Sequence, residues 1–294
     1  MKCTVVGAGA WGTALANLLA ENGHQTTLWA FEPDVSESVS AHRENRRFLP
    51  GIPLHPELRA SSALDLACEG AELVLFAPPS HVLRQVAAQA ARWIPETARL
   101  VVATKGIERD RLALMTDVVA EEIPGRAIVA LSGPSFAIEV AQHLPTAIVA
   151  ASTDAAAALH TQQALSTSAF RVYTQTDVIG VELGGALKNV MAVATGIVDG
   201  LQLGFNARAA LITRGLAEMT RLGVKLGAEP ATFAGLAGVG DLVLTCTGSL
   251  SRNRSVGIEI GRGATLSEVL QGRETVAEGV TTTESAKALA AREG

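Results

Sequence analysis

The chain has 294 residues, of which 48% are hydrophobic and 18% are charged. This composition predicts a folded protein with a sizeable core, and the length favours two domains over one. The 24 basic and 29 acidic residues give a formal net charge of −5, without any run of lysine or arginine, so we expect no nucleic-acid binding.

The first predicted elements are a strand over residues 2–6 and a helix over residues 13–20, joined by the turn Gly7-Ala8-Gly9-Ala10-Trp11-Gly12. The pattern G-x-G-x-x-G between a strand and a helix is typical of a dinucleotide site. Its first glycine permits the tight turn, the second lets a pyrophosphate approach the backbone, and the third lets the helix pack on the strand. Free amides at the helix N-terminus favour an anion there. The alternative is a turn that uses glycine only for packing.

Further strands alternate with helices through the first half of the chain. We predict them at residues 25–29, 73–76, 100–103, 128–131 and 147–150. Strands separated by helices indicate a doubly wound, Rossmann-like parallel sheet, in which ligands bind beyond the carboxyl ends of the strands. Pro78, Lys105 and Ser135 each follow such an end, so we expect their loops on one rim with the glycine turn.

The second half of the chain has a helical pattern. Asp177 is suited to cap a long helix that extends to about Val198. Further helices are expected at residues 206–222, 252–260, 266–270 and 281–292. We therefore predict a dinucleotide-binding α/β domain over residues 1–177 and an all-α substrate and catalytic domain over residues 178–294.

Lys188 lies within an apolar helix beside small residues, with Gly184 and Ala192 on the same face. Such a lysine is either a solvated side chain that extends from a packed helix or a desolvated general acid or base with a lowered pKa. Asp241 is suited either to pair with Lys188 or to cap a helix. Lys105 follows a strand beside Gly106, at the expected ligand rim.

Residues 251–254, Ser-Arg-Asn-Arg, stand at a predicted helix start. Two guanidinium groups, an amide and a hydroxyl near free helix amides suit a phosphate, and the alternative is an exposed, charged helix start.

The three cysteines and six histidines show no metal-ligand spacing, so we expect no metal site. The odd number of cysteines fits free thiols in a reducing compartment. The N-terminus leads directly into a strand, and we expect neither a signal peptide nor a membrane span.

Several segments in chain order resemble the bacterial NAD(P)-dependent glycerol-3-phosphate dehydrogenase family. They are residues 7–16, 48–52, 104–106, 132–137, 182–190, 237–242, 250–254 and 276–279. The resemblance implies hydride transfer between NAD or NADP and the pair sn-glycerol 3-phosphate and dihydroxyacetone phosphate. It also implies a cytoplasmic enzyme that supplies glycerophospholipid synthesis, and it leaves a homodimer open.

By the same resemblance, Lys188 is the general acid and base, Lys105 polarises the substrate carbonyl, and Asp241 orients the two lysines. The residues implied to bind substrate are Lys105, Gly133, Ser135, Lys188, Asp241, Ser251, Arg252 and Asn253. Those implied to bind the cofactor are Gly7, Gly9, Ala10, Trp11, Gly12, Phe31, Lys105, Ala137, Arg252, Val276 and Glu278.

The sequence departs from the family at two places. Glu32, about 20 residues beyond the glycine turn, favours a free ribose hydroxyl and hence NAD, whereas Arg43, Arg46 or Arg47 could meet the 2′-phosphate of NADP. The family also continues beyond the position of Gly294, and we expect that difference to affect stability or oligomer packing more than chemistry.

Two alternatives share parts of this pattern. A ketopantoate-type or other β-hydroxyacid reductase has the same architecture, but the run 251–254 argues for a phosphorylated substrate. A nucleotide sensor without turnover would not need the combination of Lys105, Lys188 and Asp241.

Overall fold

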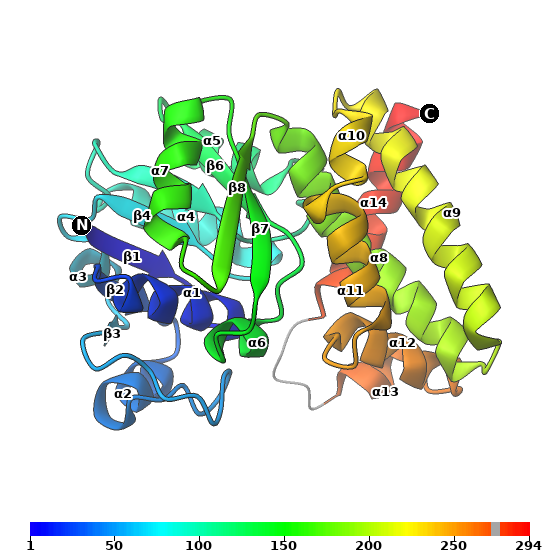
Figure 1. Ribbon diagram of the computed structural model, residues 1–294, viewed down its shortest axis with the longest axis horizontal. Helices are drawn as coiled ribbons and strands as arrows, with labels where there is room; N and C mark the ends of the chain where they lie inside the picture. The colour runs from blue at the N-terminus through cyan, green and yellow to red at the C-terminus, as the bar shows by residue number, and fades with distance from the viewer. Residues whose placement is uncertain (272–276) are drawn as a thin grey trace. The chain divides into compact units, whose positions relative to one another are not determined.

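The computed structural model describes residues 1–271 and 277–294, and these divide into two compact units (Figure 1). The first unit comprises Met1–Thr104, Met115–Leu131 and Ser135–Thr176. The second comprises Lys105–Leu114, Ser132–Pro134 and Asp177–Gly294. Two short segments from the first half of the chain therefore belong to the second unit, and they carry Lys105 and Gly133.

The first unit is built on an eight-stranded sheet with the order β3-β2-β1-β4-β5-β6-β7-β8. The strands are β1 (Lys2–Val6), β2 (Gln25–Trp29), β3 (Arg59–Ser61), β4 (Leu73–Phe76), β5 (Arg99–Val102), β6 (Ile128–Ser132), β7 (Thr146–Ala151) and β8 (Phe170–Gln175). Neighbours from β3 through β6, and the pair β7–β8, run parallel. The order reverses at β1, which confirms the doubly wound prediction and puts the glycine turn at the switch point where ligands bind.

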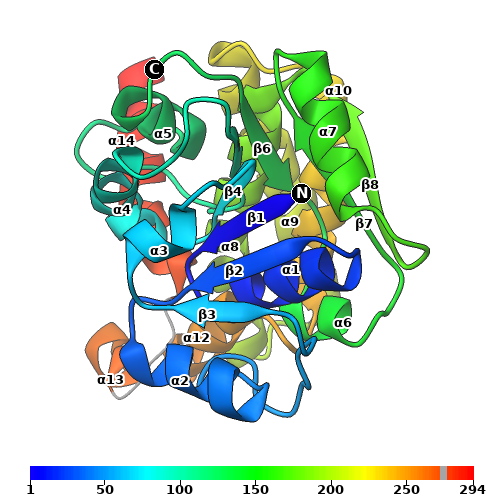
Figure 2. The same ribbon diagram turned by 90° about the vertical axis from the view of Figure 1, so that its left-hand side faces the viewer.

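Helices cover both faces of this sheet (Figure 2). They are α1 (Ala10–Glu21), α2 (Pro33–His42), α3 (Leu64–Cys68), α4 (Leu83–Ala91), α5 (Met115–Glu122), α6 (Ala137–Ala141) and α7 (Ala155–Leu165), with a 3₁₀ turn at Ser80–Val82. α1 packs against α6 and α7, and α4 packs against α3 and α5. Leu15 and Leu19 of α1 are fully buried in one core with Val5, Leu28 and Leu75 of the sheet.

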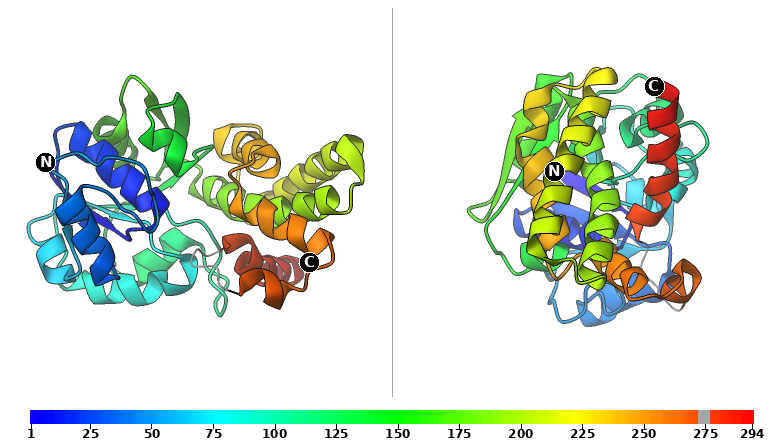
Figure 3. Two further views of the ribbon diagram at one scale, coloured as in Figure 1. Left: turned by 90° about the horizontal axis from the view of Figure 1, so that it is seen from below. Right: turned by 90° about the vertical axis from the view of Figure 1, so that its right-hand side faces the viewer.

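The second unit is helical, as predicted, and Figure 3 shows it from two further directions. Its helices are α8 (Val178–Gly200), α9 (Gly204–Lys225), α10 (Pro230–Phe233), α11 (Asp241–Thr247), α12 (Arg252–Gly261), α13 (Leu266–Leu270) and α14 (Glu278–Glu293), with a π-helical turn at Leu236–Gly240 before α11. Asp177 caps α8, because its carboxylate accepts a hydrogen bond of 2.8 Å from the Gly180 amide. α8 packs against α9, α11, α12 and α14 and is the centre of this unit.

α8 and α12 approach each other closely because glycines line their contact. A Cβ at Gly196 would collide with the Arg254 carbonyl oxygen, and a Cβ at Gly257 would collide with the Val193 carbonyl oxygen. The backbones themselves are therefore in contact. This contact sets the distance between Lys188 on α8 and the start of α12.

Two stretches of the described chain, Val178–Gly200 and Pro230–Thr247, are long and apolar enough to cross a membrane by length and composition alone. In α8, however, 67% of the apolar window is buried inside the structure. A helix that is surrounded by other helices is apolar on most of its sides. Burial in the second unit therefore accounts for the composition of α8.

Candidate active site

Two lysines share one buried carboxylate in the second unit. Lys188 Nζ donates hydrogen bonds to Asp241 Oδ1 (2.5 Å) and Thr245 Oγ1 (2.9 Å). Lys105 Nζ donates to Asp241 Oδ2 (2.7 Å) and to the Gly133 carbonyl oxygen (3.1 Å). Asp241 is fully buried, whereas the side chains of Lys188 and Lys105 retain 10% and 15% of their exposure. Solvent or a ligand can therefore contact the two lysines, whereas their counter-ion Asp241 is not accessible.

Burial changes the acidity of Lys188. Desolvation lowers the pKa of its ammonium to about 8, the Asp241 carboxylate opposes this shift, and Lys105 adds to it. A lysine with a pKa near 8 exchanges its proton close to physiological pH, which suits a general acid or base. Two ammonium groups against one carboxylate also leave a net positive charge, which favours an oxygen that becomes negative.

Among the described residues, hydrogen bonds occupy two of the three protons of each ammonium. An ammonium has three N–H donors, and the structure gives two acceptors to each lysine: Asp241 and Thr245 to Lys188, and Asp241 and Gly133 to Lys105. A carbonyl oxygen has two lone pairs and can accept both remaining donors. The lysine pair can therefore hold a substrate carbonyl or alkoxide oxygen between its two nitrogens.

Thr245 is a member of this site that the sequence reasoning missed. Its hydroxyl accepts from Lys188 and donates to the Asp241 carbonyl oxygen (2.7 Å), one turn earlier in α11. The spacing of four residues from Asp241 puts both side chains on one face of a helix, and this was the available signal.

The start of α12 has the polar groups that were expected there, but one of them has a different task. Ser251 is the N-cap, and its hydroxyl accepts from the Arg254 amide (3.2 Å). The Arg254 guanidinium is ion-paired with Asp199 at the end of α8 (2.6 Å), so we correct its assignment to the phosphate cluster: it holds α12 against α8. The side chain of Arg252 retains solvent exposure.

Asn253 links three helices close to Arg252. Its buried amide donates to Asn189 Oδ1 on α8 (3.0 Å) and accepts from the Gly279 amide on α14 (2.9 Å). Desolvation lowers the pKa of the Arg252 guanidinium, and the nearby Glu278 carboxylate opposes that shift. Arg252, Asn253 and Glu278 are therefore brought together in the second unit. Val276 lies outside the described residues.

The glycine turn of the first unit fits a dinucleotide. Gly7 has φ +117°, and a Cβ there would lie 2.7 Å from the backbone of Ala77 and Pro78. A Cβ at Gly12 would collide with the Gly7 carbonyl oxygen, whereas a Cβ at Gly9 would meet nothing within 4 Å. The open side of the turn is thus at Gly9, where α1 begins without a side-chain cap. The first amides of α1 have no partner within the helix and are available to a pyrophosphate.

Trp11 and Asn45 add to this turn. Within the described chain, Trp11 Nε1 is buried without a hydrogen-bond partner, which leaves a donor beside the start of α1. The fully buried Asn45 donates to the Ala8 carbonyl oxygen and to Thr13 Oγ1, both at 2.8 Å, and accepts from the Phe48 amide (3.0 Å). It therefore ties the loop before residues 48–52 to the turn. The sequence reasoning missed Asn45, because nothing local marks it.

Two other residues expected to bind the cofactor lie in the first unit. Phe31 follows β2 and is 76% exposed, with its ring edge-on to Trp29. Ala137 begins α6, which packs against α1. Of the residues expected to bind substrate, Ser135 precedes α6 and belongs to the first unit, whereas Gly133 belongs to the second.

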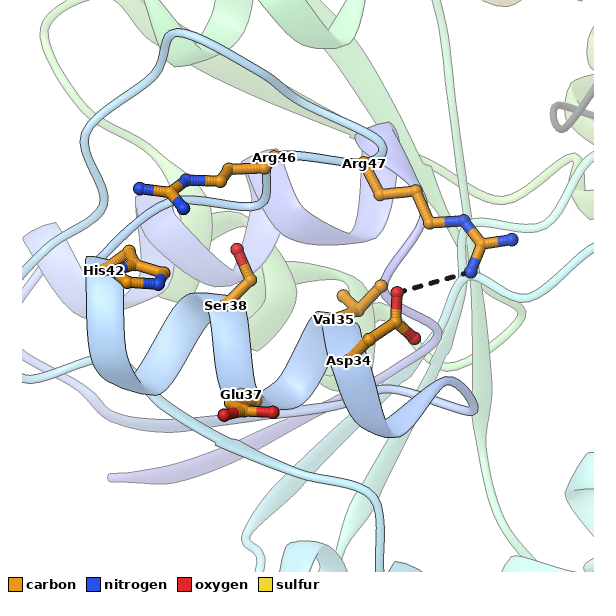
Figure 4. A pocket seen from close by; sticks show the side chains of 7 residues that line it. All are labelled: Asp34, Val35, Glu37, Ser38, His42, Arg46 and Arg47. Carbon is orange, nitrogen blue, oxygen red and sulfur yellow. Dashed lines mark ion pairs between the residues drawn. The ribbon is translucent and has the colours of Figure 1, made fainter.

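The region after β2 bears on the choice between NAD and NADP. Glu32 is the N-cap residue of α2. Arg43 donates to the Leu58 carbonyl oxygen (2.9 Å), and Arg46 contacts Glu44 (3.4 Å). Arg47 is paired with Asp34 (3.5 Å) beside a hollow with charges of both signs (Figure 4). Its lining is Asp34, Val35, Glu37, Ser38, His42, Arg46 and Arg47. Each arginine that could meet a 2′-phosphate already has a partner.

Comparisons with known proteins match almost the whole chain. Residues 2–158 match the family model for the N-terminus of NAD-dependent glycerol-3-phosphate dehydrogenase, and residues 177–294 match the model for its C-terminus. The chain belongs to this dehydrogenase family. Its enzymatic activity is the interconversion of glycerol 3-phosphate and dihydroxyacetone phosphate with NAD or NADP.

Individual relatives of the dehydrogenase are similar over their length. The glycerol-3-phosphate dehydrogenase [NAD(P)+] of Citrifermentans bemidjiense is 56% identical over 100% of this chain and 88% of the relative. The glycerol-3-phosphate dehydrogenase [NAD(P)+] of Geobacter sulfurreducens is 57% identical over 99% of this chain and 88% of the relative. The crystal structure of glycerol-3-phosphate dehydrogenase from Coxiella burnetii has a TM-score of 0.96 and 42% identity, and covers 99% of this chain and 89% of that one. These relationships favour the dehydrogenase over the ketopantoate-type reductase considered above.

Proposed function

We propose that Lys188 is the general acid and base of the dehydrogenase. In the reducing direction its ammonium donates a proton to the oxygen on C2 of the substrate, and in the oxidising direction its neutral amine removes that proton. When bound, the nicotinamide ring supplies or accepts the hydride. The observation that carries this proposal is the Asp241 bridge, which keeps the buried Lys188 amine beside a second cation.

Lys105 is the second donor to the same oxygen in this proposal. Negative charge that develops on the oxygen is stabilised by donors that are already in position, which is more effective in a buried site than in water. Asp241 holds both ammonium groups, and Gly133 orients Lys105 through its carbonyl oxygen. Asp241 and Gly133 thus act by positioning the lysines.

The substrate phosphate is assigned to the start of α12. Ser251, Arg252 and Asn253 supply a hydroxyl, a guanidinium and an amide at a helix N-terminus, where an anion is favoured. Ser135 is proposed to complete the substrate-binding residues. Binding the phosphate at a distance from C2 positions the reacting carbon, and this is a large source of rate for a small substrate.

Residues 1–177 are proposed as the dinucleotide-binding domain, and residues 178–294 as the substrate and catalytic domain. The proposed cofactor-binding residues are Gly7, Gly9, Ala10, Trp11, Gly12, Phe31, Lys105, Ala137, Arg252, Val276 and Glu278. The free amides of α1 and the unpartnered Trp11 indole support the part of this assignment that lies in the first unit. The partnered arginines after β2 support NAD over NADP.

We also propose a cytoplasmic enzyme that supplies sn-glycerol 3-phosphate for glycerophospholipid synthesis. Three free, buried cysteines support the location. The homodimer stays a prediction, which sedimentation at several protein concentrations would test.

The experiment that tests the proposed function is the initial rate of dihydroxyacetone phosphate reduction with NADH and NADPH in parallel. We expect turnover with both and a higher kcat/KM with NADH. The Lys188→Met variant is the matched control and should bind NADH normally with a kcat lowered by about 10²–10⁴-fold. A Lys188→Met variant with the wild-type rate would refute the role of Lys188. A higher kcat/KM with NADPH would refute the prediction that Glu32 favours NAD.

A further inference from the structure

Ser132 has a buried hydroxyl without a hydrogen-bond partner in the described chain. The residue ends β6, is 5% exposed, and belongs to the second unit. Buried polar side chains are nearly always hydrogen-bonded, because an unmade bond leaves the desolvation of the group uncompensated. We therefore expect the Ser132 hydroxyl to form a hydrogen bond with a bound molecule.

Its position is beside the lysine pair. A Cβ at Gly185 would lie 2.5 Å from Ser132 Oγ and 3.4 Å from Lys105 Cδ, so the hydroxyl and the Lys105 stem meet the same point of α8. That point is one turn before Lys188 on the helix. Ser132 also directly precedes Gly133, whose carbonyl oxygen holds Lys105 Nζ. The hydroxyl thus lies beside the Lys105 side chain and beside the turn of α8 that precedes Lys188.

The polar groups of the substrate can be matched to donors one by one. Dihydroxyacetone phosphate has a carbonyl oxygen, a phosphate and one free hydroxyl. The carbonyl oxygen accepts hydrogen bonds from the two remaining protons of the lysine pair, and the phosphate is assigned to the start of α12. Within the second unit, no donor or acceptor has been assigned to the free hydroxyl on the carbon next to the carbonyl.

We propose that Ser132 binds this free hydroxyl of the substrate. A serine hydroxyl can donate and accept at once, as the substrate hydroxyl can, so either direction of the hydrogen bond is available. The proposal rests on the proposed function, because it assumes that the carbonyl lies at Lys105 and Lys188. It adds a determinant of specificity: the enzyme distinguishes its substrate from an analogue in which the hydroxymethyl group is a methyl group.

The test compares these two substrates in the wild-type chain and in Ser132→Ala. Removing the hydroxyl should lower kcat/KM for dihydroxyacetone phosphate about tenfold and leave kcat/KM for the methyl analogue within about twofold of the wild-type value. The preference between the substrates therefore falls about tenfold. NADH affinity should not change. The melting temperature should not fall, because the variant loses an unpaired buried group.

Thr282 provides the matched control. It is the other serine or threonine among the described residues with a buried, unpartnered hydroxyl, it lies in the same unit on α14, and no role in the site is proposed for it. Thr282→Val should leave the substrate preference unchanged. Ser132→Cys keeps the size of the side chain with a weaker hydrogen-bonding group and should give an intermediate preference.

The outcomes separate this proposal from the proposed function. A wild-type chain that does not reduce dihydroxyacetone phosphate would refute the function itself. If the wild type turns over but Ser132→Ala loses the same factor with both substrates, the residue has a structural effect only, and the proposal is overturned. An unchanged kcat/KM for dihydroxyacetone phosphate in Ser132→Ala also overturns it.

Discussion

Replacing Asp241 by asparagine should move the pH at which the enzyme changes activity. Lys188 Nζ lies 2.5 Å from Asp241 Oδ1. At this distance a pair of unit charges is worth about 1.7 kcal/mol even with the dielectric constant of water, and less screening inside the protein increases it. One pKa unit corresponds to about 1.4 kcal/mol, so Asp241→Asn should lower the Lys188 pKa from its value of about 8 by at least about one unit.

The assay is the pH dependence of kcat/KM in both directions, which reports the ionisation of the free enzyme. Oxidation of glycerol 3-phosphate needs the neutral amine, so the wild-type value should rise with pH to a plateau above about 8, and reduction should fall over the same interval. In Asp241→Asn both midpoints should lie near pH 7 or below, whatever the loss of rate at the plateau.

Asp199→Asn is the control for this prediction. It removes a partly buried carboxylate of the same unit that is paired with Arg208 and Arg254 and not with a lysine. Its pH midpoints should match the wild-type midpoints. An Asp241→Asn midpoint that stays at the wild-type pH, or rises, would show that Asp241 does not control the acidity of Lys188.

Four other variants test separate parts of the site. Gly9→Ala should weaken NADH binding about tenfold in calorimetry without changing the melting temperature, since its Cβ meets nothing within 4 Å. Gly12→Ala should lower both the NADH affinity and the melting temperature, because its Cβ collides with the Gly7 carbonyl oxygen. A Gly12→Ala melting temperature equal to that of the wild type would contradict the packing argument. Lys188→Met should lower kcat by about 10²–10⁴-fold at unchanged NADH affinity, and a parallel loss of affinity would mark Lys188 as structural. Arg252→Ala should raise KM for dihydroxyacetone phosphate about 10–100-fold with little change in kcat, and an unchanged KM would exclude Arg252 from the phosphate site.

The buried strands of the sheet could be predicted from sequence, whereas its edges could not. Strand β4 is a continuous apolar run and β1 is buried from Cys3 to Val6, because both faces of these strands are covered. The two strands that the sequence reasoning missed, β3 and β8, are the outermost strands of the sheet. β3 is a three-residue strand, Arg59–Ser61, and β8 carries exposed Arg171 and Tyr173. Edge strands are short and polar because one of their sides faces solvent, so their local pattern is weak.

The site shows the same division between local and distant information. A cap such as Asp177 is visible in sequence because its partner is three residues away. The partner of Arg254 is Asp199, 55 residues earlier, and only the packing of α8 on α12 reveals it. Ser132 becomes informative for the same reason, since its unpaired hydroxyl is apparent only when α8 lies against it.

The contact between α8 and α12 has a consequence for substrate size. In the proposed site, the proton is transferred from one of these helices and the phosphate is held by the other. Their separation is set at Gly196 and Gly257 by the absence of side chains. The close contact between α8 and α12 therefore limits the length of the carbon chain that fits between the reacting carbon and the phosphate. Larger side chains at Gly196 or Gly257 would move the two helices apart and admit a longer substrate, although neither residue is proposed to contact the substrate.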